Sequence, residues 1–160
     1  MITNTHDVLG LIPKEEISLV FESLTDGFFD SITRWWYDTS VQINKKADFS
    51  PDLYPCNDKQ CIKKLTFIAH GEKSVISEAF VNMHLRDGSI LTESADNNDI
   101  SSYFNGFEYC KNGCEIKLIS CYLGKSPYLE YNIKRATGCN VKLYDRMVNA
   151  LFPELLLPGY

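Results

Sequence analysis

Two side chains that could serve as a nucleophile and a base follow two similar apolar segments. His70 comes directly after the apolar run 64–69, and Cys121 comes directly after the run 115–120. Cysteine attacks a carbonyl carbon only as the thiolate, so it needs a proton acceptor, usually histidine, within hydrogen-bonding reach. Both runs are typical of short buried strands. If the strands are parallel neighbours, His70 and Cys121 lie at the carboxyl edge of the sheet, where ligands bind in open α/β sheets.

The backbone around these residues also suits an acyl-transfer reaction. Attack on a carbonyl group creates an oxyanion, which is stabilised by backbone N–H donors. Gly71 leaves its N–H group open to approach, and the N–H group of Cys121 is a second donor. We therefore expect a His70–Cys121 dyad beside an oxyanion hole formed by the backbone of Gly71 and Cys121.

Together, the two segments resemble the caspase-like (clan CD) cysteine peptidases. They read LTFIAHG over 65–71 and IKLISCYLG over 116–124, and the order and separation of histidine and cysteine are similar to those of caspases. The helix, glycine and strand predicted after the cysteine look like the bacterial toxin and CHAT-like branch of this clan. The resemblance covers residues 62–146.

The resemblance implies a peptidase in which His70 is the general base and acid and Cys121 is the nucleophile. It also implies that Asp145 and Arg146, just beyond the last strand, line the substrate pocket, where a carboxylate favours a basic side chain before the cut. The implied partner is a protein or peptide substrate, and the chain would be a bacterial effector or toxin. No metal or organic cofactor is implied, although some members of the toxin branch are activated by a small ligand.

Other functions remain open. The same dyad suits an amidase or another acyl-transferring cysteine enzyme. Alternatively, the domain is a catalytically inactive binding or adaptor module that keeps the fold. A further arrangement places Cys56 or Cys61 before His70 or His84, as in papain-like enzymes, but His70 follows too closely for a strand to intervene. We expect His84 itself to be an exposed or hydrogen-bonded residue of a strand.

The elements that must position the dyad form an alternating pattern of strands and helices, which predicts an α/β fold. We expect a three-layer αβα sandwich with a mostly parallel central sheet, N-terminal helices and a β-hairpin insert. The length of 160 residues fits one domain, divided into an N-terminal helical region and loop (1–60), a core sheet (62–146) and a tail (147–160). The expected elements are helices over 13–24, 30–41, 96–104 and 127–137, a loop over 45–59, a hairpin over 79–92 and a strand over 140–144.

Composition restricts the partners. The net charge is -5 and no basic patch stands out, so nucleic acid is not an expected partner. No apolar run approaches the roughly 18 residues of a membrane span, and the first residues do not form a signal peptide. The predicted location is the cytoplasm, or the outside of the cell by a route independent of a signal peptide; the oligomeric state stays open.

Six cysteines are more than a domain of this size usually contains. Close pairs occur at Cys56/Cys61 and Cys110/Cys114, and Cys139 is expected to pack at the start of a strand. Three interpretations remain open: mostly unpaired thiols, disulfides formed outside the cytoplasm, or a four-thiolate zinc site. The zinc site is disfavoured because neither pair has the usual two intervening residues.

Overall fold

The computed structural model describes residues 14–24, 40–51, 59–73, 80–149 and 151–153, together with Ser31 and Trp36. In chain order the strands are β1 (Glu15–Ser23), β2 (Val41–Gln42), β3 (Gln60–Lys73), β4 (Val81–His84), β5 (Ile90–Glu93), β6 (Glu115–Ile119) and β7 (Asn140–Lys142). The helices are α3 (Asp99–Ser102) and α4 (Leu129–Thr137), and the 3₁₀ turns are η1 (Lys46–Asp48) and η2 (Leu123–Lys125). β3 is longer than its neighbours: it pairs in parallel with β1 and β6, and its last residues pair antiparallel with β4.

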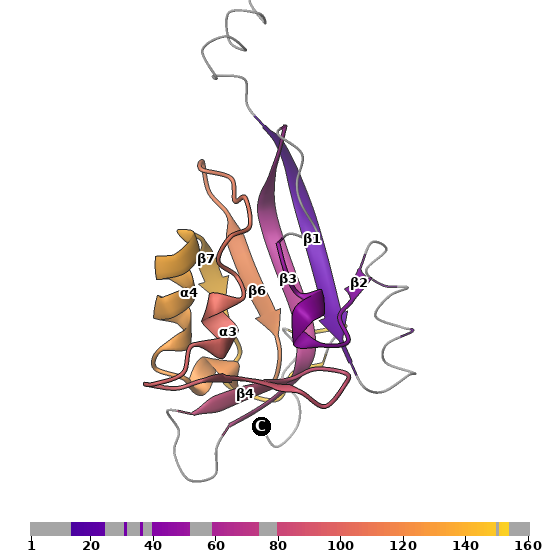
Figure 1. Ribbon diagram of the computed structural model, residues 1–160, viewed down its shortest axis with the longest axis vertical. Coiled ribbons are helices and arrows are strands. Elements are labelled where there is room, and N and C mark those ends of the chain that lie inside the picture. The colour runs from indigo at the N-terminus through magenta and orange to yellow at the C-terminus, as the bar shows by residue number, and fades with distance from the viewer. Residues whose placement is uncertain are drawn as a thin grey trace, which may run out of the picture.

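The parallel part of the sheet contains β2, β1, β3, β6 and β7, in that spatial order. β3 lies in its centre, between β1 and β6 (Figure 1). The chain winds outward from β1 to β2 and in the other direction from β3 to β6 and β7. Ligands of open parallel sheets bind at the carboxyl ends of the strands, so the carboxyl ends of β3 and its neighbours are the first place to look for a site.

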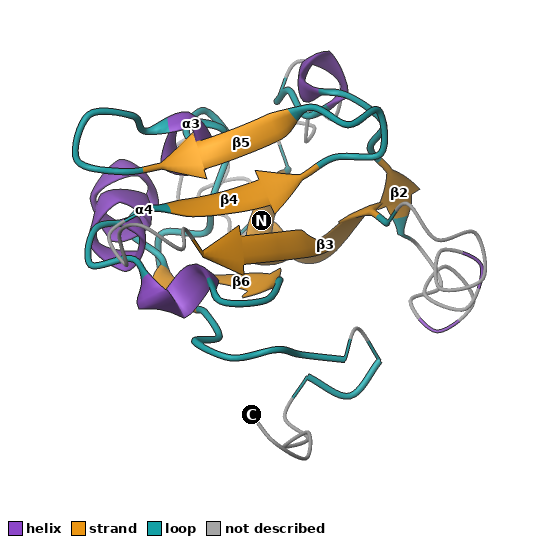
Figure 2. Cartoon of the chain, turned by 90° about the horizontal axis from the view of Figure 1, so that it is seen from below, coloured by secondary structure: helices purple, strands orange, loops and turns teal. Residues whose placement is uncertain are grey.

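The antiparallel part is formed by the end of β3 and the hairpin of β4 and β5. His70 pairs with His84 and Lys73 with Val81, and β4 pairs in turn with β5. Figure 2 shows β5, β4, β3 and β6 side by side. The turn of the hairpin contains Gly88, whose φ of 87° is accessible at little cost only to glycine. The hairpin predicted over 79–92 is therefore confirmed for its described residues.

The prediction of a three-layer αβα sandwich with N-terminal helices is wrong. The sheet is mixed, and β1 occupies the segment predicted as the first helix. Ile17, Leu19 and Phe21 pack on the main core, whereas Val20 packs on the other face of the sheet. So short an apolar run satisfies both the helical and the extended period. β1 is extended because it pairs with β3 along its whole length.

The helices found in the described part of the chain are short and pack against each other. Figure 1 shows α3 and α4 together beside β6 and β7. α3 covers only part of the predicted helix 96–104, whereas α4 ends at Gly138 as predicted, with φ 75°. The predicted helix 30–41 and the tail 147–160 lie largely outside the described residues. Neither α3 nor α4 is long and apolar enough to cross a membrane.

The sheet separates two apolar clusters. The main core contains an aromatic group with ring centroids 4.8 to 6.4 Å apart, contributed by β1, β3 and the loops: Phe21, Phe49, Phe67, Phe104 and Phe107. Burying each such ring contributes about 1.5–3 kcal/mol. On the other face, a second cluster consists of Leu24, Ile68, Ile119 and Tyr144. Val20 and Val148 pack against this second cluster.

Candidate active site

The pairing of β3 with β6 brings the predicted dyad to one edge of the sheet. The two strands run in parallel from Lys64 opposite Glu115 to Ile68 opposite Ile119. Two further residues along each chain lead to His70 and Cys121. His70 shares a face of β3 with Ile68 of the second apolar cluster. Cys121 lies two residues beyond the end of β6, in the turn at the carboxyl end of that strand. β3 does not stop at His70, as the sequence suggested, but continues to Lys73.

Gly71 brings the backbone of β3 against the backbone that follows β6. A methyl group at this position would collide with the carbonyl oxygen of Cys121 and with Ser120 Oγ, and would lie 3.0 Å from the backbone nitrogen of Cys121. Only glycine tolerates so close an approach between two segments of the backbone. The predicted donors, the backbone groups of Gly71 and Cys121, therefore belong to one small region of the structure.

Cys121 is partly exposed, and its sulfur lies beside Val148 in the segment that follows β7. The N–H group of Val148 donates to Sγ at 3.4 Å, and the thiol points back to the carbonyl oxygen of Val148 at 3.9 Å. Tyr122, the next residue, has φ 65°, in the left-handed region that non-glycine residues rarely adopt. Its N–H group donates to the carbonyl oxygen of Arg146 at 3.1 Å. The chain thus turns sharply at the thiol, and strained backbone of this kind is concentrated at functional sites.

The two predicted pocket residues have different surroundings. The guanidinium group of Arg146 donates to the carbonyl oxygens of Met147 and Pro153, at 3.1 and 2.8 Å. Arg146 therefore anchors the chain's own C-terminal segment. Asp145 is exposed and lines a groove of about 400 Å³ next to α4 and β7, together with Glu130 and other residues. The role of Asp145 in substrate binding stays a prediction.

A polar network on the hairpin was missed as part of the site. Nε2 of His84 lies 2.9 Å from Oε1 of Glu72, and the amide of Asn82 donates to the same oxygen at 3.1 Å. The hydrogen bond from Asn82, followed by that from His84, lowers the pKa of the Glu72 carboxyl below its ordinary value. The signal in the sequence was the alternation of polar side chains: Glu72 stands two residues after His70, and His84 two residues after Asn82.

Disulfides, one of the three interpretations left open by the sequence, are present at the amino ends of β3, β6 and β7. Cys61 is bonded to Cys110, and Cys114 to Cys139. The interpretation as mostly unpaired thiols is wrong, and the close pairs in the sequence are not the bonded pairs, because strand pairing joins segments that are distant along the chain. Cys56 lies outside the described residues.

Metal binding has no support in the described segments. Within them, no cluster of three or more His, Cys, Asp and Glu side chains is arranged to hold an ion. The four bonded sulfur atoms are not thiolates, so they cannot form the zinc site considered above. Cys121 is the unpaired cysteine of these segments.

No protein-family model, no curated protein and no solved structure matches this chain.

Proposed function

We propose that the protein is a cysteine hydrolase that cleaves a peptide bond in a protein or peptide, with Cys121 as the nucleophile and His70 as the acid and base. The observation that carries the proposal is the common register of β3 and β6, whose extension leads to both side chains at the carboxyl edge. The close approach of Gly71 to the backbone of Cys121 supports it further. The sequence resemblance to caspase-like peptidases supports the choice of a peptide bond.

In the proposed reaction, His70 takes the proton of the thiol, and the thiolate of Cys121 attacks the carbonyl carbon. A carbon–sulfur bond forms and the carbonyl oxygen becomes an oxyanion, to which the N–H groups of Gly71 and Cys121 donate. The protonated His70 then gives its proton to the leaving nitrogen as the carbon–nitrogen bond breaks. Water, deprotonated by His70, attacks the thioester, and the carbon–sulfur bond breaks to release the acid and the thiol.

The inactive binding module is the second candidate, and one contact favours it. The N–H group of Val148 donates to the sulfur of Cys121, and the thiol of Cys121 points to the carbonyl oxygen of the same residue. A substrate carbonyl must displace this segment to reach the thiol. In an inactive module, the same contact would be permanent.

The disulfides favour export over a cytoplasmic location. Disulfides form and persist mainly in oxidising surroundings. We therefore propose that the chain acts outside the cytoplasm in which it is made, in line with an exported effector.

The test is site-resolved alkylation of the folded protein by limiting iodoacetamide, with the disulfides kept intact and each labelled cysteine identified by mass spectrometry. At about pH 6.5, we expect Cys121 to react at least about tenfold faster than the same residue in the unfolded chain, because an imidazole partner stabilises the thiolate. His70→Gln should remove this advantage. Lys64→Gln, an exposed change on the same strand, should keep it.

Peptide cleavage provides the second readout. Incubation with a mixed peptide library should produce new N-termini that are absent with Cys121→Ala. If Cys121 reacts no faster than in the unfolded chain and no peptide is cut, the protein is not a cysteine hydrolase, and the binding module becomes the better description.

A further inference from the structure

The open face of the antiparallel part carries a row of polar side chains that begins at His70. In the ladder, His70 lies opposite His84, and Glu72 lies opposite Asn82. On β5, Thr92 lies opposite Asn82. Residues two apart share a face, and directly opposed side chains have Cβ atoms about 4.5–5.5 Å apart. The row therefore extends outward from the edge at which Cys121 lies.

Hydrogen bonds fix the order of this row. Thr92 Oγ1 donates to Oδ1 of Asn82 at 2.8 Å, which directs the NH₂ group of Asn82 toward Glu72. His84 supplies the second donor to the same oxygen of Glu72. The pKa of Glu72 is lowered by these two partners, Asn82 first, so the carboxylate is charged at neutral pH. Glu72 thus binds one ring nitrogen of His84 and defines the orientation of its ring.

Stability does not explain this arrangement. The side chains of His84 and Glu72 are 31% and 52% exposed, and exposed ion pairs contribute only about 0–1 kcal/mol. The opposite face of the same strands carries the buried residues Val81, Met83 and Leu91, which already hold the hairpin to the core. A connected polar network on the open face is therefore better explained by the histidine beside it.

We propose that His84 and Glu72 are positioning residues for His70, the imidazole partner of Cys121. The inference rests on the proposed function and names two residues that the sequence resemblance does not include. With an Nε2–H group bound to Glu72, a neutral His84 has Nδ1 as its acceptor. An N–H group of His70 that donates to this atom leaves the other nitrogen of His70 to take the thiol proton.

The surroundings of His84 leave Glu72 as its carboxylate partner. In the described strands, His84 faces Glu72 and His70 on β3 and the apolar Ile90 on β5. The turn η2, which ends with Lys125, also packs against β4. The next charged residue along the chain, Arg86, donates to the carbonyl oxygen of Leu24.

The experiment measures the alkylation rate of Cys121 in the full chain at about pH 6 and about pH 9. Variants are Glu72→Gln and His84→Gln. The matched control is Glu115→Gln, which removes another half-exposed carboxylate whose partner is Lys64 at 3.7 Å. We expect both variants to react about tenfold more slowly than the wild type at about pH 6 and within about twofold of it at about pH 9. At the higher pH the thiolate forms without help from an imidazole. The control should match the wild type at both pH values.

The outcomes separate the inference from the proposed function. If His70→Gln slows the reaction but Glu72→Gln and His84→Gln do not, the inference is overturned and the dyad stands. If the two variants slow the reaction equally at both pH values, their role is structural, and the inference is again overturned. If His70→Gln also has no effect, the proposed function itself fails. Near-ultraviolet circular dichroism checks folding, and either variant alone is sufficient for the test if the other does not fold.

Discussion

The two ends of the parallel sheet use cysteine in opposite ways. At the amino end, Cys61 is the second residue of β3 and is bonded to Cys110. Cys114 and Cys139, directly before β6 and β7, are bonded to each other. At the carboxyl end, Cys121 follows β6 as a partly exposed thiol. The same residue type thus crosslinks one end of the sheet and supplies a free thiol at the other.

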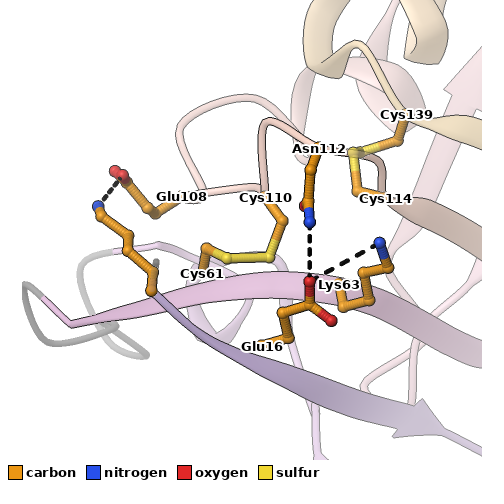
Figure 3. Close-up of a disulfide and its surroundings, with 9 residues drawn as sticks. Glu16, Cys61, Lys63, Glu108, Cys110, Asn112, Cys114 and Cys139 are labelled. Carbon is orange, nitrogen blue, oxygen red and sulfur yellow. Dashed lines mark hydrogen bonds and ion pairs between the residues drawn. A yellow bond between two sulfur atoms is a disulfide. The ribbon is translucent and has the colours of Figure 1, made fainter. Parts of the chain in front are cut away.

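The residues around the disulfides also differ from those around the free thiol. At the amino end, ion pairs and a hydrogen bond accompany the disulfides. Lys14 pairs with Glu108, and Lys63 and Asn112 both contact the carboxylate of Glu16 (Figure 3). At the carboxyl end, the backbone is strained and closely approached by another chain segment. The disulfides and the free thiol thus lie at opposite ends of the sheet, so the two can be altered separately.

The largest expected effect is on stability at the amino end. Replacing both Cys61 and Cys110 by Ser should lower the free energy of unfolding by about 4 kcal/mol, because the bond closes a long loop. The bond between Cys114 and Cys139, with a sequence separation of 25 against 49, should contribute about 3.5 kcal/mol. Urea unfolding without reductant measures both. Cys121→Ser is the control, with a change below about 1 kcal/mol; an equally large loss there would contradict the division between the two ends.

The next effect should appear at the carboxyl end. Gly71→Ala places a methyl group against the backbone of Cys121, which should cost about 1–3 kcal/mol of stability and slow the alkylation of Cys121 about tenfold. The control is Gly88→Ala, which is strained by its positive φ but meets no atom within 4 Å. It should leave the alkylation rate unchanged. Equal effects of the two variants on Cys121 would show that the approach of Gly71 has no special relation to the thiol.

The smallest effect concerns pH and stability. The hydrogen bond from Asn82 lowers the pKa of Glu72 from its ordinary value of 4.5. A lowered pKa contributes stability above the ordinary value, and this contribution is lost as the pH falls through the lower value of the folded state. Glu72→Gln should therefore cost less than about 0.5 kcal/mol near neutral pH, since the group is exposed, and nothing in strong acid.

Glu108, at the amino end, is a matched comparison because its pKa is also lowered, chiefly by the hydrogen bond from Lys14. Glu108→Gln should show the same pH dependence of unfolding as Glu72→Gln, but only Glu72→Gln should change the alkylation of Cys121. If both substitutions changed the alkylation rate of Cys121, the effect would come from net charge and not from the position of Glu72.

Much of the carboxyl edge could be predicted because its signals are local. The apolar runs before His70 and Cys121 are strands, and the Asp-Gly turn marks the hairpin. The first strand could not be predicted in the same way, because Ile17, Val20, Phe21 and Leu24 also recur at helical spacing. Its conformation is decided by β3, whose pairing residues lie more than forty positions further along the chain.

By itself, the sequence determined which residue types could perform chemistry and where two short buried strands lie, because apolar runs and turn residues act over a few positions. Only the tertiary structure decided which strands are neighbours, and with them the partners of the cysteines and the row from His70 to Glu72. Those relations depend on the register between distant segments, and the free energy that selects a register comes from burial in the whole core.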